Sequence, residues 1–579
     1  MVQSVTWKIG GEAGFGIMSS GTMLARAFSR AGYHIFATNE YPSLIRGGHN
    51  LVTVRIATEK FEAMNRDVHI LVALNKETID LHKTEVSEGG LVIFDPKDGE
   101  WKENDFPKKI ILLAVPLKDL VQQLHGEPVM RNTVALGATV ALIGADFEML
   151  ASVIRDQFRK KGDEVVNQNM RIAKAGYDYI KKTFGNETSM YLGKVQKKED
   201  QLVINASEAV GIGAVRAGLK FAAIYPMTPI NALITYLADH AKQFGIVYKQ
   251  PEDEIAGINM AIGASVAGVR SMVATSGGGF ALMVEGLSLA GMIEVPLVID
   301  LGMRVGPATG MPTWTEQGEL LFAIYAGHGE FPRIVLAPAD AAEAYSLTTH
   351  AFNLADQYQV PVFLLTDKYI NESQWCVPVS QLNGAVVIDR GKLALGNLPA
   401  LDGESSFPRY RNNTDVGVSP RSVPGVAGGR YFANSYEHDE AGHVTEDATK
   451  RAAMVAKRLK KLHAIQHIAQ QPAVFGDPDA QLTFVSWGSS RGPILEAMKL
   501  LGKKGGKARL IHYSWLYPFP SEETLKLLSP ATRLIDVEQN ATGQLATLIR
   551  QHTGILIKEK LLKYDGRPWY PEEIVEKVI

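Results

Sequence analysis

The chain has 579 residues, with 60 Lys and Arg against 62 Asp and Glu, and its formal net charge is −2. At roughly 150 residues per domain, this length allows about three or four domains, and the balanced charge disfavours nucleic-acid binding as the main task, because that task needs a broad basic surface. One cysteine, Cys376, excludes an internal disulfide framework and any four-cysteine iron–sulfur or zinc site built from this chain alone. It favours a reducing, cytoplasmic setting.

The sequence predicts neither a signal peptide nor a membrane span. The first residues lack a positively charged start followed by an apolar stretch. The most apolar regions, residues 258–274 and 281–301, are interrupted by charged residues and never reach about 18 uninterrupted apolar residues.

The first section alternates short apolar runs with a helical pattern. A helix is predicted at 17–31, and strands are predicted at 5–9, 70–74, 91–94 and 110–115. This alternation predicts a parallel sheet covered by helices. The charged stretch 185–201 is typical of a linker, so we expect a first domain over residues 1–185.

The same pattern restarts after the linker and predicts a second α/β domain over residues 200–385. Strands are predicted at 221–225, 271–274, 296–301 and 360–365, and helices at 230–244, 254–267, 281–292 and from 341 onward. Residues 386–475 are predicted to be an irregular connecting segment, because much of this stretch holds many Pro, Gly, Asn and Arg residues with little periodicity.

The alternation returns near the C-terminus and predicts a third α/β domain over residues 476–579. Its strands are predicted at 482–487, 508–513, 533–537 and 555–557. The expected fold class is therefore α/β, with three parallel-sheet domains and a long irregular segment before the last one.

The segment Gly10 to Gly16 holds four glycines and follows a predicted strand. Such a turn exposes N–H groups at a helix start, where a phosphate can bind, but a tight turn that needs positive φ explains the glycines equally well. The order of glycines does not fit the dinucleotide fingerprint. Arg46, in a second rigid turn, is interpreted as a structural surface residue.

Tyr225-Pro226-Met227-Thr228-Pro229 stands just after a predicted strand. In open α/β sheets, ligands bind beyond the carboxyl ends of the strands. The two prolines restrict the backbone on either side of Thr228 and hold its hydroxyl at that edge. A plain strand-ending turn is the competing interpretation.

Three acidic residues, Glu252 to Glu254, open the next predicted helix. Acidic groups at a helix start are stabilised by the helix dipole, which is the plain explanation. Gly257 and Ala261 lie three and seven residues after Glu254, so the helix face beneath Glu254 carries very small side chains. A flat organic ring or a partner backbone could approach that face closely.

Two more segments end predicted strands. Ser276 to Gly279 is small enough to leave room for a ligand or another chain. Arg304 follows a very apolar strand, and its guanidinium suits a carboxylate in bidentate geometry. A structural ion pair is the alternative for Arg304.

In their order and spacing, these segments resemble the alpha subunit of 2-oxoacid:ferredoxin oxidoreductases, which are thiamine-diphosphate enzymes. Residues 1–185 resemble the family's gamma unit, residues 200–385 its pyrimidine-type thiamine domain, and residues 476–579 its transketolase C-terminal-like domain. Residues 415–421 and 437–440 are similar to the fused gamma–alpha form that acts on 2-oxoglutarate. One departure is the start Asn205-Ala206-Ser207-Glu208, where the family has Gly-Asn-Glu-Ala, and it affects local backbone geometry.

The resemblance implies roles for particular residues. Glu254 would bind the N1′ atom of the thiamine pyrimidine, with Glu252 as the fallback. Thr228 and Arg304 would hold the carboxylate of a 2-oxoacid. The cofactor-binding residues implied on this chain are Glu254, Pro226, Thr228, Ser276 and Gly277, and no metal ligand is assigned to it.

The resemblance also implies partners. The Gly-Asp-Gly segment that holds Mg²⁺ and pyrophosphate in such enzymes does not occur in the 579 residues. A beta subunit is therefore expected to bring the diphosphate site, Mg²⁺ and a 4Fe–4S cluster, with ferredoxin as electron acceptor and coenzyme A as co-substrate, in an (alpha–beta)2 heterotetramer. The expected reaction is oxidative decarboxylation of a 2-oxoacid, with 2-oxoglutarate favoured.

Two other functions stay open at this point. One is a self-contained thiamine-dependent decarboxylase or synthase, which the missing Gly-Asp-Gly segment opposes. The other is a non-catalytic scaffold subunit, in which Glu254 would only stabilise a helix start.

Overall fold

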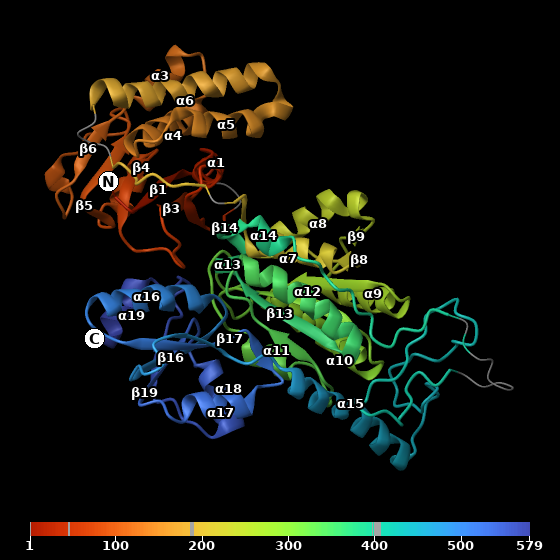
Figure 1. The fold of residues 1–579 in the computed structure, drawn as a ribbon. Coiled ribbons are helices and arrows are strands. Elements are labelled where there is room, and N and C mark those ends of the chain that lie inside the picture. The colour runs from red at the N-terminus through yellow and green to blue at the C-terminus, as the bar shows by residue number, and fades with distance from the viewer. Residues whose placement is uncertain (1, 45–46, 186–189, 198, 397, 399–406) are drawn as a thin grey trace. The chain divides into compact units, whose positions relative to one another are not determined.

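The structure, a computed structural model, describes residues 2–44, 47–185, 190–197, 199–396, 398 and 407–579 (Figure 1). They form two compact units. The first unit runs to Asn205 and also includes Ser373–Asn383 and Tyr570–Ile579, and the second comprises Ala206–Glu372 and Gly384–Trp569. No helix among the described residues is long and apolar enough to cross a membrane.

The first unit is built on an eight-stranded sheet in the order β6-β5-β4-β1-β3-β2-β14-β7. Its strands are β1 (Ser4–Glu12), β2 (His34–Glu40), β3 (His49–Ala57), β4 (Val68–Ala73), β5 (Val86–Phe94), β6 (Ile111–Ala114), β7 (Gln201–Ile204) and β14 (Gln374–Pro378). Its helices are α1 (Ile17–Arg30), α2 (Lys76–His82), α3 (Leu117–Gln123), α4 (Arg131–Leu142), α5 (Phe147–Phe158), α6 (Asp163–Thr183), α14 (Val379–Leu382) and α19 (Pro571–Val578).

This first sheet is mixed, whereas the sequence pattern predicted a parallel one. Strands β1, β4, β5 and β6 are parallel neighbours, but β3 runs antiparallel to both β1 and β2, and β14 runs antiparallel to β2 and β7. The β2 and β3 strands, which form an antiparallel hairpin joined by residues 41–48, were not predicted. Figure 1 shows α4, α5 and α6 packed together beside the sheet.

The alternation of side chains along β4 divides the core of this unit between two faces. Ile70 and Val72 belong to the larger apolar cluster, which α1, α4 and α5 cover. Leu71 and Ala73 point to the other face and pack in a smaller cluster with Ile79 of α2. A strand buried on both faces reads as a continuous apolar run, which is why β4 was predictable.

The second unit contains a seven-stranded sheet in the order β18-β12-β13-β11-β10-β8-β9, parallel except for β18. Its strands are β8 (Leu219–Ala223), β9 (Val247–Lys249), β10 (Arg270–Thr275), β11 (Leu297–Met303), β12 (Ile334–Leu336), β13 (Pro361–Asp367) and β18 (Trp515–Tyr517). Its helices are α7 (Ala206–Arg216), α8 (Asn231–Phe244), α9 (Glu254–Val266), α10 (Gly277–Met292), α11 (Leu320–Tyr325), α12 (Ala341–Tyr358) and α13 (Lys368–Glu372).

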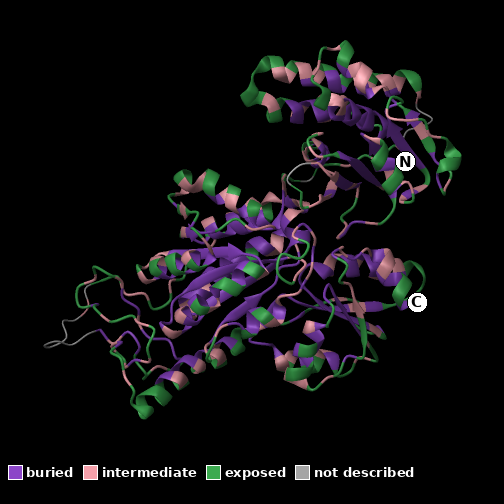
Figure 2. Ribbon diagram, turned by 180° about the vertical axis from the view of Figure 1, so that it is seen from behind, coloured by how far each residue is buried: buried purple, intermediate pink, exposed green. Residues whose placement is uncertain are grey.

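A five-stranded sheet in the order β15-β17-β16-β19-β20 completes this unit. Its elements are β15 (Ala473–Gly476), β16 (Leu482–Trp487), β17 (Ala508–Tyr513), β19 (Arg533–Glu538), β20 (Glu559–Leu562), α16 (Arg491–Lys503), α17 (Ser521–Leu528) and α18 (Gln544–Thr553). The strand predicted at 555–557 is wrong, since those residues form no strand and β20 begins at Glu559. Side chains of both sheets share one apolar cluster, and Figure 2 shows these strands as mostly buried.

The segment predicted to be irregular contains one long helix. Between α14 and α15 (Ala448–Ile468), the described residues form no helix and only isolated β-bridges, as at Leu393 with Arg421. The 21-residue helix α15 lies inside the predicted 386–475 segment and was missed there, because its apolar positions are few and most of its buried side chains are Lys or Arg.

Candidate active site

Three parallel strands of the second unit end at one edge of its sheet. Thr228 follows β8, Ser276 follows β10, and Arg304 follows β11, and these strands are neighbours in the order β11-β10-β8. The carboxyl ends of parallel strands lie at the same edge, which is where open α/β sheets bind ligands. The topology therefore brings the sequence-predicted residues to one edge.

Glu254 is the first residue of α9 and is 3% exposed. The preceding residue, Asp253, caps the helix by accepting a hydrogen bond from the Ala256 N–H at 2.8 Å. The Oε1 atom of Glu254 is buried and has no hydrogen-bond partner among the described residues. Buried polar atoms are nearly always paired in proteins, so this oxygen marks a place where a donor belongs. Glu252, the fallback, is exposed.

The helix face beneath Glu254 is closed by the chain's own backbone. A Cβ atom on Gly257 would lie 3.3 Å from the carbonyl oxygen of Ala223, at the end of β8. Ala261 is fully buried in the apolar cluster. The small side chains thus let α9 pack tightly on β8, and the expectation that a flat ring or a partner backbone would approach this face is wrong.

Space beside Glu254 comes from the glycines of α10. A Cβ atom on Gly279 would lie 2.4 Å from Oε1 of Glu254 and 2.1 Å from Oγ1 of Thr275. A Cβ on Gly277 would lie 2.5 Å from Oε1 of Glu319, whereas a Cβ on Gly278 meets nothing closer than 3.8 Å. Two of the three glycines are therefore needed for close approach of a buried carboxyl group.

Arg304 and Thr228 are in direct contact. The Nη1 atom of Arg304 donates a hydrogen bond to the carbonyl oxygen of Thr228 at 2.9 Å. Burial lowers the pKa of Arg304, and Glu319 raises it. Pro226 is exposed at the same loop, and the hydroxyl of Ser276 is buried without a partner among the described residues.

Sequence reasoning missed two acids of this unit whose pKa values are raised. Glu319 follows the loop after Arg304, and burial followed by the charge of Glu316 raises its pKa to about 8, while Arg304 opposes that shift. Burial also raises the pKa of Asp300 on β11 to about 7, against a hydrogen bond from Thr366. The spacing of Glu316 and Glu319 before an apolar helix was the only available signal for Glu319.

The glycine-rich segment of the first unit fits a tight turn. Gly14 and Gly16 have φ of 96° and 71°, and Gly16 caps α1. A Cβ atom on Gly16 would lie 2.2 Å from Nδ2 of Asn132. These glycines therefore meet backbone and packing requirements, which supports the structural interpretation. Arg46 lies outside the described residues.

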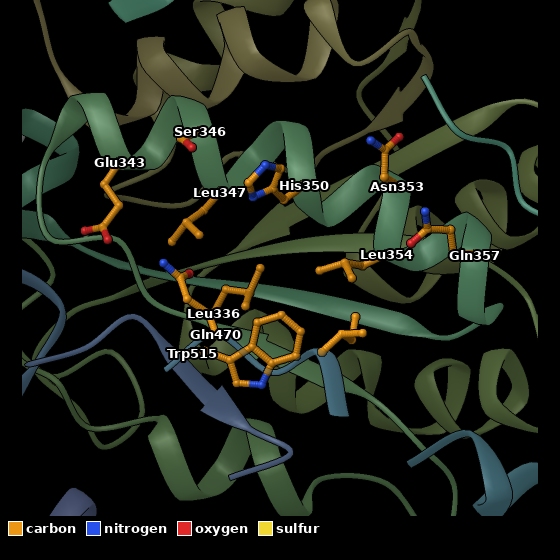
Figure 3. Close-up of a pocket in the computed structure, with 11 residues that line it drawn as sticks. Leu336, Glu343, Ser346, Leu347, His350, Asn353, Leu354, Gln357, Gln470 and Trp515 are labelled. Carbon is orange, nitrogen blue, oxygen red and sulfur yellow. The ribbon is translucent and has the colours of Figure 1, made fainter. Parts of the chain in front are cut away.

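A cavity of about 480 Å³ lies elsewhere in the second unit, along α12 (Figure 3). Trp515 forms part of its wall and donates its indole N–H to the Pro518 carbonyl oxygen at 3.0 Å. Glu343 in the same wall is bound by Arg491 and Ser514. None of the sequence-predicted site residues lines this cavity.

Comparisons with known proteins match both units. Residues 212–457 match the family model for pyruvate flavodoxin/ferredoxin oxidoreductase, thiamine diphosphate-binding, and residues 6–179 match that for pyruvate ferredoxin/flavodoxin oxidoreductase. The fold and the family matches thus define a thiamine-diphosphate-binding oxidoreductase subunit that acts on 2-oxoacids.

The full-length relatives narrow this class. The 2-oxoacid:ferredoxin oxidoreductase 2, subunit alpha, of Aeropyrum pernix is 33% identical over 98% of this chain and 96% of its own length. The 2-oxoglutarate oxidoreductase subunit KorA of Mycobacterium tuberculosis is 28% identical over 95% of this chain and 87% of its own. This chain belongs to the family of alpha subunits of 2-oxoacid:ferredoxin oxidoreductases.

A solved structure covers the entire fold. The 2-oxoglutarate:ferredoxin oxidoreductase of Magnetococcus marinus, with 2-oxoglutarate, coenzyme A and succinyl-CoA bound, aligns with a TM-score of 0.91 and 31% identity over 100% of this chain and 99% of that one. The predicted family, the α/β fold with three mostly parallel sheets, and the oxidoreductase activity are confirmed.

Proposed function

We propose that this chain is the fused gamma–alpha subunit of a 2-oxoglutarate:ferredoxin oxidoreductase, which converts 2-oxoglutarate and coenzyme A to succinyl-CoA and CO₂ and passes the electrons to ferredoxin. The observation that carries the catalytic part is the buried, unpartnered Oε1 of Glu254 beside Gly279. The substrate preference is supported by the ligands of the Magnetococcus relative and by the name of the mycobacterial one.

The residues present fit thiamine diphosphate. When bound, this cofactor supplies the electron sink that loss of CO₂ requires. Glu254 would hold a proton at the N1′ atom of the cofactor's pyrimidine ring, because its Oε1 atom is buried and no described residue donates a hydrogen bond to it. Pro226, Ser276 and Gly277 would contribute the neighbouring wall.

Thr228 and Arg304 would bind the carboxylate of the 2-oxoacid. The guanidinium donates one hydrogen bond to the Thr228 carbonyl oxygen, which holds its plane while other N–H groups remain for a carboxylate. This anchor must not stabilise the ground-state carboxylate so strongly that loss of CO₂ is opposed.

A partner would complete the site. No Gly-Asp-Gly segment occurs in this chain, so a beta subunit would bring the diphosphate site, Mg²⁺ and a 4Fe–4S cluster in an (alpha–beta)2 assembly. Large exposed apolar side chains on α9 and α10 support a partner subunit covering these two helices. The side chains are Ile255, Met260 and Leu282, which are 44–50% exposed. Exposed apolar groups of this size, when clustered, mark protein interfaces.

The test is Glu254→Gln in the complex reconstituted with its beta subunit. We expect ferredoxin reduction with 2-oxoglutarate to fall by ~100-fold or more, because the amide cannot hold the relay proton. Glu252→Gln is the matched control, and its activity should stay within about twofold of the parent, since that side chain is exposed.

Two outcomes would contradict the proposal. Activity of Glu254→Gln within about twofold of the parent would favour a scaffold role for this chain. Faster turnover of pyruvate than of 2-oxoglutarate by the parent complex would defeat the proposed substrate preference.

A further inference from the structure

The carboxyl groups of Glu254, which is buried, and of Glu319, which is half-buried, both lie against the start of α10, and the proposed mechanism uses only Glu254. Glu254 lies against Gly279, and Glu319 lies against Gly277, two residues earlier. The Oε2 atom of Glu319 is buried and has no hydrogen-bond partner among the described residues. A buried carboxyl oxygen without a partner makes the ionised form of the side chain costly, so the presence of Glu319 beside this site calls for an explanation.

The groups around Glu319 include one cation, Arg304. Glu316, in the loop before Glu319, accepts a hydrogen bond from the Gly306 N–H at 3.1 Å and repels a second negative charge. The first turn of α10 brings no charged side chain. From α18, the neutral Gln544 contacts this loop through the Leu321 N–H. Glu254 of α9 lies beside Gly279, two residues further along α10 than the Gly277 that Glu319 approaches.

Arg304 forms a hydrogen bond with Thr228 and no ion pair with Glu319 among the described residues. Its Nη1 atom donates to the Thr228 carbonyl oxygen, while Glu319 and Arg304 influence each other electrostatically. An ionised Glu319 would attract the guanidinium and neutralise its charge in a low-dielectric setting. A protonated Glu319 leaves that charge for an incoming anion.

We infer that Glu319 is a positioning residue that holds a proton in the working enzyme and thereby keeps the Arg304 guanidinium available to the carboxylate of the 2-oxoacid. Ionisation of Glu319 creates an internal competitor for the substrate. This inference rests on the proposed function, because it takes Arg304 as the substrate anchor.

The direction of the pH effect follows from burial. Desolvation, with the charge of Glu316, raises the pKa of Glu319 to about 8, so the side chain is mostly protonated near pH 7 and mostly ionised near pH 9. If only the protonated form leaves Arg304 free, the KM for 2-oxoglutarate in the parent complex rises about tenfold between those two pH values, with a smaller change in kcat.

The test variant is Glu319→Gln, which keeps the size of the side chain and removes its titration. In the reconstituted complex we expect its KM for 2-oxoglutarate to stay level from about pH 7 to about pH 9. Glu330→Gln is the matched control, since Glu330 is exposed eleven residues further along and should keep the parent's profile. The same rise of KM in Glu319→Gln as in the parent would overturn the inference.

A second measurement does not depend on turnover. Infrared difference spectra of the complex should show a protonated carboxyl band that disappears as the pH rises through about 8 and is missing in Glu319→Gln. Lack of this band overturns the inference even when the enzyme turns over normally. Failure of the proposed function looks different, because the parent would then reduce no ferredoxin with a 2-oxoacid at any pH.

Discussion

At the residue scale, the site is organised by which side chains are missing. Gly277 and Gly279 stand where a Cβ atom would collide with Glu319 and Glu254, whereas a Cβ on Gly278 between them would meet only ordinary van der Waals contact, 3.8 Å from the Ala308 carbonyl oxygen. The buried Glu254 and the half-buried Glu319 are thereby brought against one helix start. Alanine substitutions at these three adjacent glycines distinguish two effects of the added methyl group. One is a collision with a neighbouring carboxyl group, and the other is the higher helix propensity of alanine.

Gly279→Ala should disable the enzyme. The new methyl group would lie within van der Waals overlap of Glu254 and Thr275, and such overpacking typically costs about 1–3 kcal/mol. We expect the shift of Glu254 to reduce ferredoxin reduction by ~10-fold or more, measured in the reconstituted complex.

Gly278→Ala is the matched control for that prediction. Its Cβ has 3.8 Å of clearance, and Ala is favoured over Gly within helices by about 0.5–1 kcal/mol. We therefore expect unchanged activity and equal or slightly higher resistance to urea. Equal activity in the two variants would show that the space beside Glu254 is not used.

At the scale of elements, buried charges anchor the described residues of 386–475 within the second unit. Asp356 on α12 accepts hydrogen bonds from Arg270 and Arg390 at 2.8 Å and from Arg421 at 3.0 Å. Glu294, after α10, forms ion pairs with Lys457 and Lys461 of α15. Burial alone would raise the pKa of Glu294, but these cations hold it well below its usual range.

Asp356→Asn should loosen this segment. The substitution leaves three guanidinium groups around a neutral amide, and breaking a buried ion pair from one side costs about 3–5 kcal/mol. We expect faster proteolytic cleavage within residues 407–447 and a lower urea midpoint for the second unit. Asp415→Asn, at an exposed position of the same segment, is the control, and the protease should cleave this variant at the same rate as the parent.

Stability unchanged in Asp356→Asn would mean that apolar contacts, and not these charges, order the segment. Tyr410 and Phe407 are buried there and are the side chains that would then be responsible. The ring of Tyr410 packs against that of His438, with centroids 4.0 Å apart and the ring planes tilted by 45°.

At the scale of the whole molecule, the proposed function assigns half of an active site to this chain. The chain contains the buried acid Glu254 and the candidate carboxylate anchor formed by Thr228 and Arg304. It has only one cysteine and no Gly-Asp-Gly segment. Among the described residues, no group of His, Cys, Asp and Glu side chains is arranged to hold a metal ion. The second unit exposes apolar side chains on α9 and α10, close in sequence to that half-site.

The purified chain by itself should bind thiamine diphosphate weakly and contain no iron. Calorimetric titration with thiamine diphosphate and Mg²⁺, together with iron analysis, should show tight binding and iron only after the beta subunit is added. The pyrophosphate and metal contacts supply much of the affinity for such a cofactor, and a separate chain would provide them. Tight binding to the isolated chain would instead support a self-contained thiamine enzyme.

Periodicity predicted most of the second unit. Strands β16 and β17 lie at the predicted residues, and α9 and β13 differ by one or two at an end. Buried parallel strands read as continuous apolar runs and amphipathic helices repeat every 3.6 residues, so both are local signals. The β2 and β3 strands escaped prediction because their local signals are weak. Helix α15 escaped prediction because most of its buried positions are charged residues.

The sequence by itself determined the family, the α/β class and the candidate residues Glu254, Thr228 and Arg304, since these depend on motifs, order and composition. Tertiary structure alone decided that Gly257 packs on β8, that Gly279 makes room for Glu254, and that Glu319 lies against Gly277 within electrostatic reach of Arg304. Space and burial arise from residues far apart in the chain that meet only on folding. Because desolvation and side-chain contacts depend on which distant residues come together, no local sequence pattern predicts them.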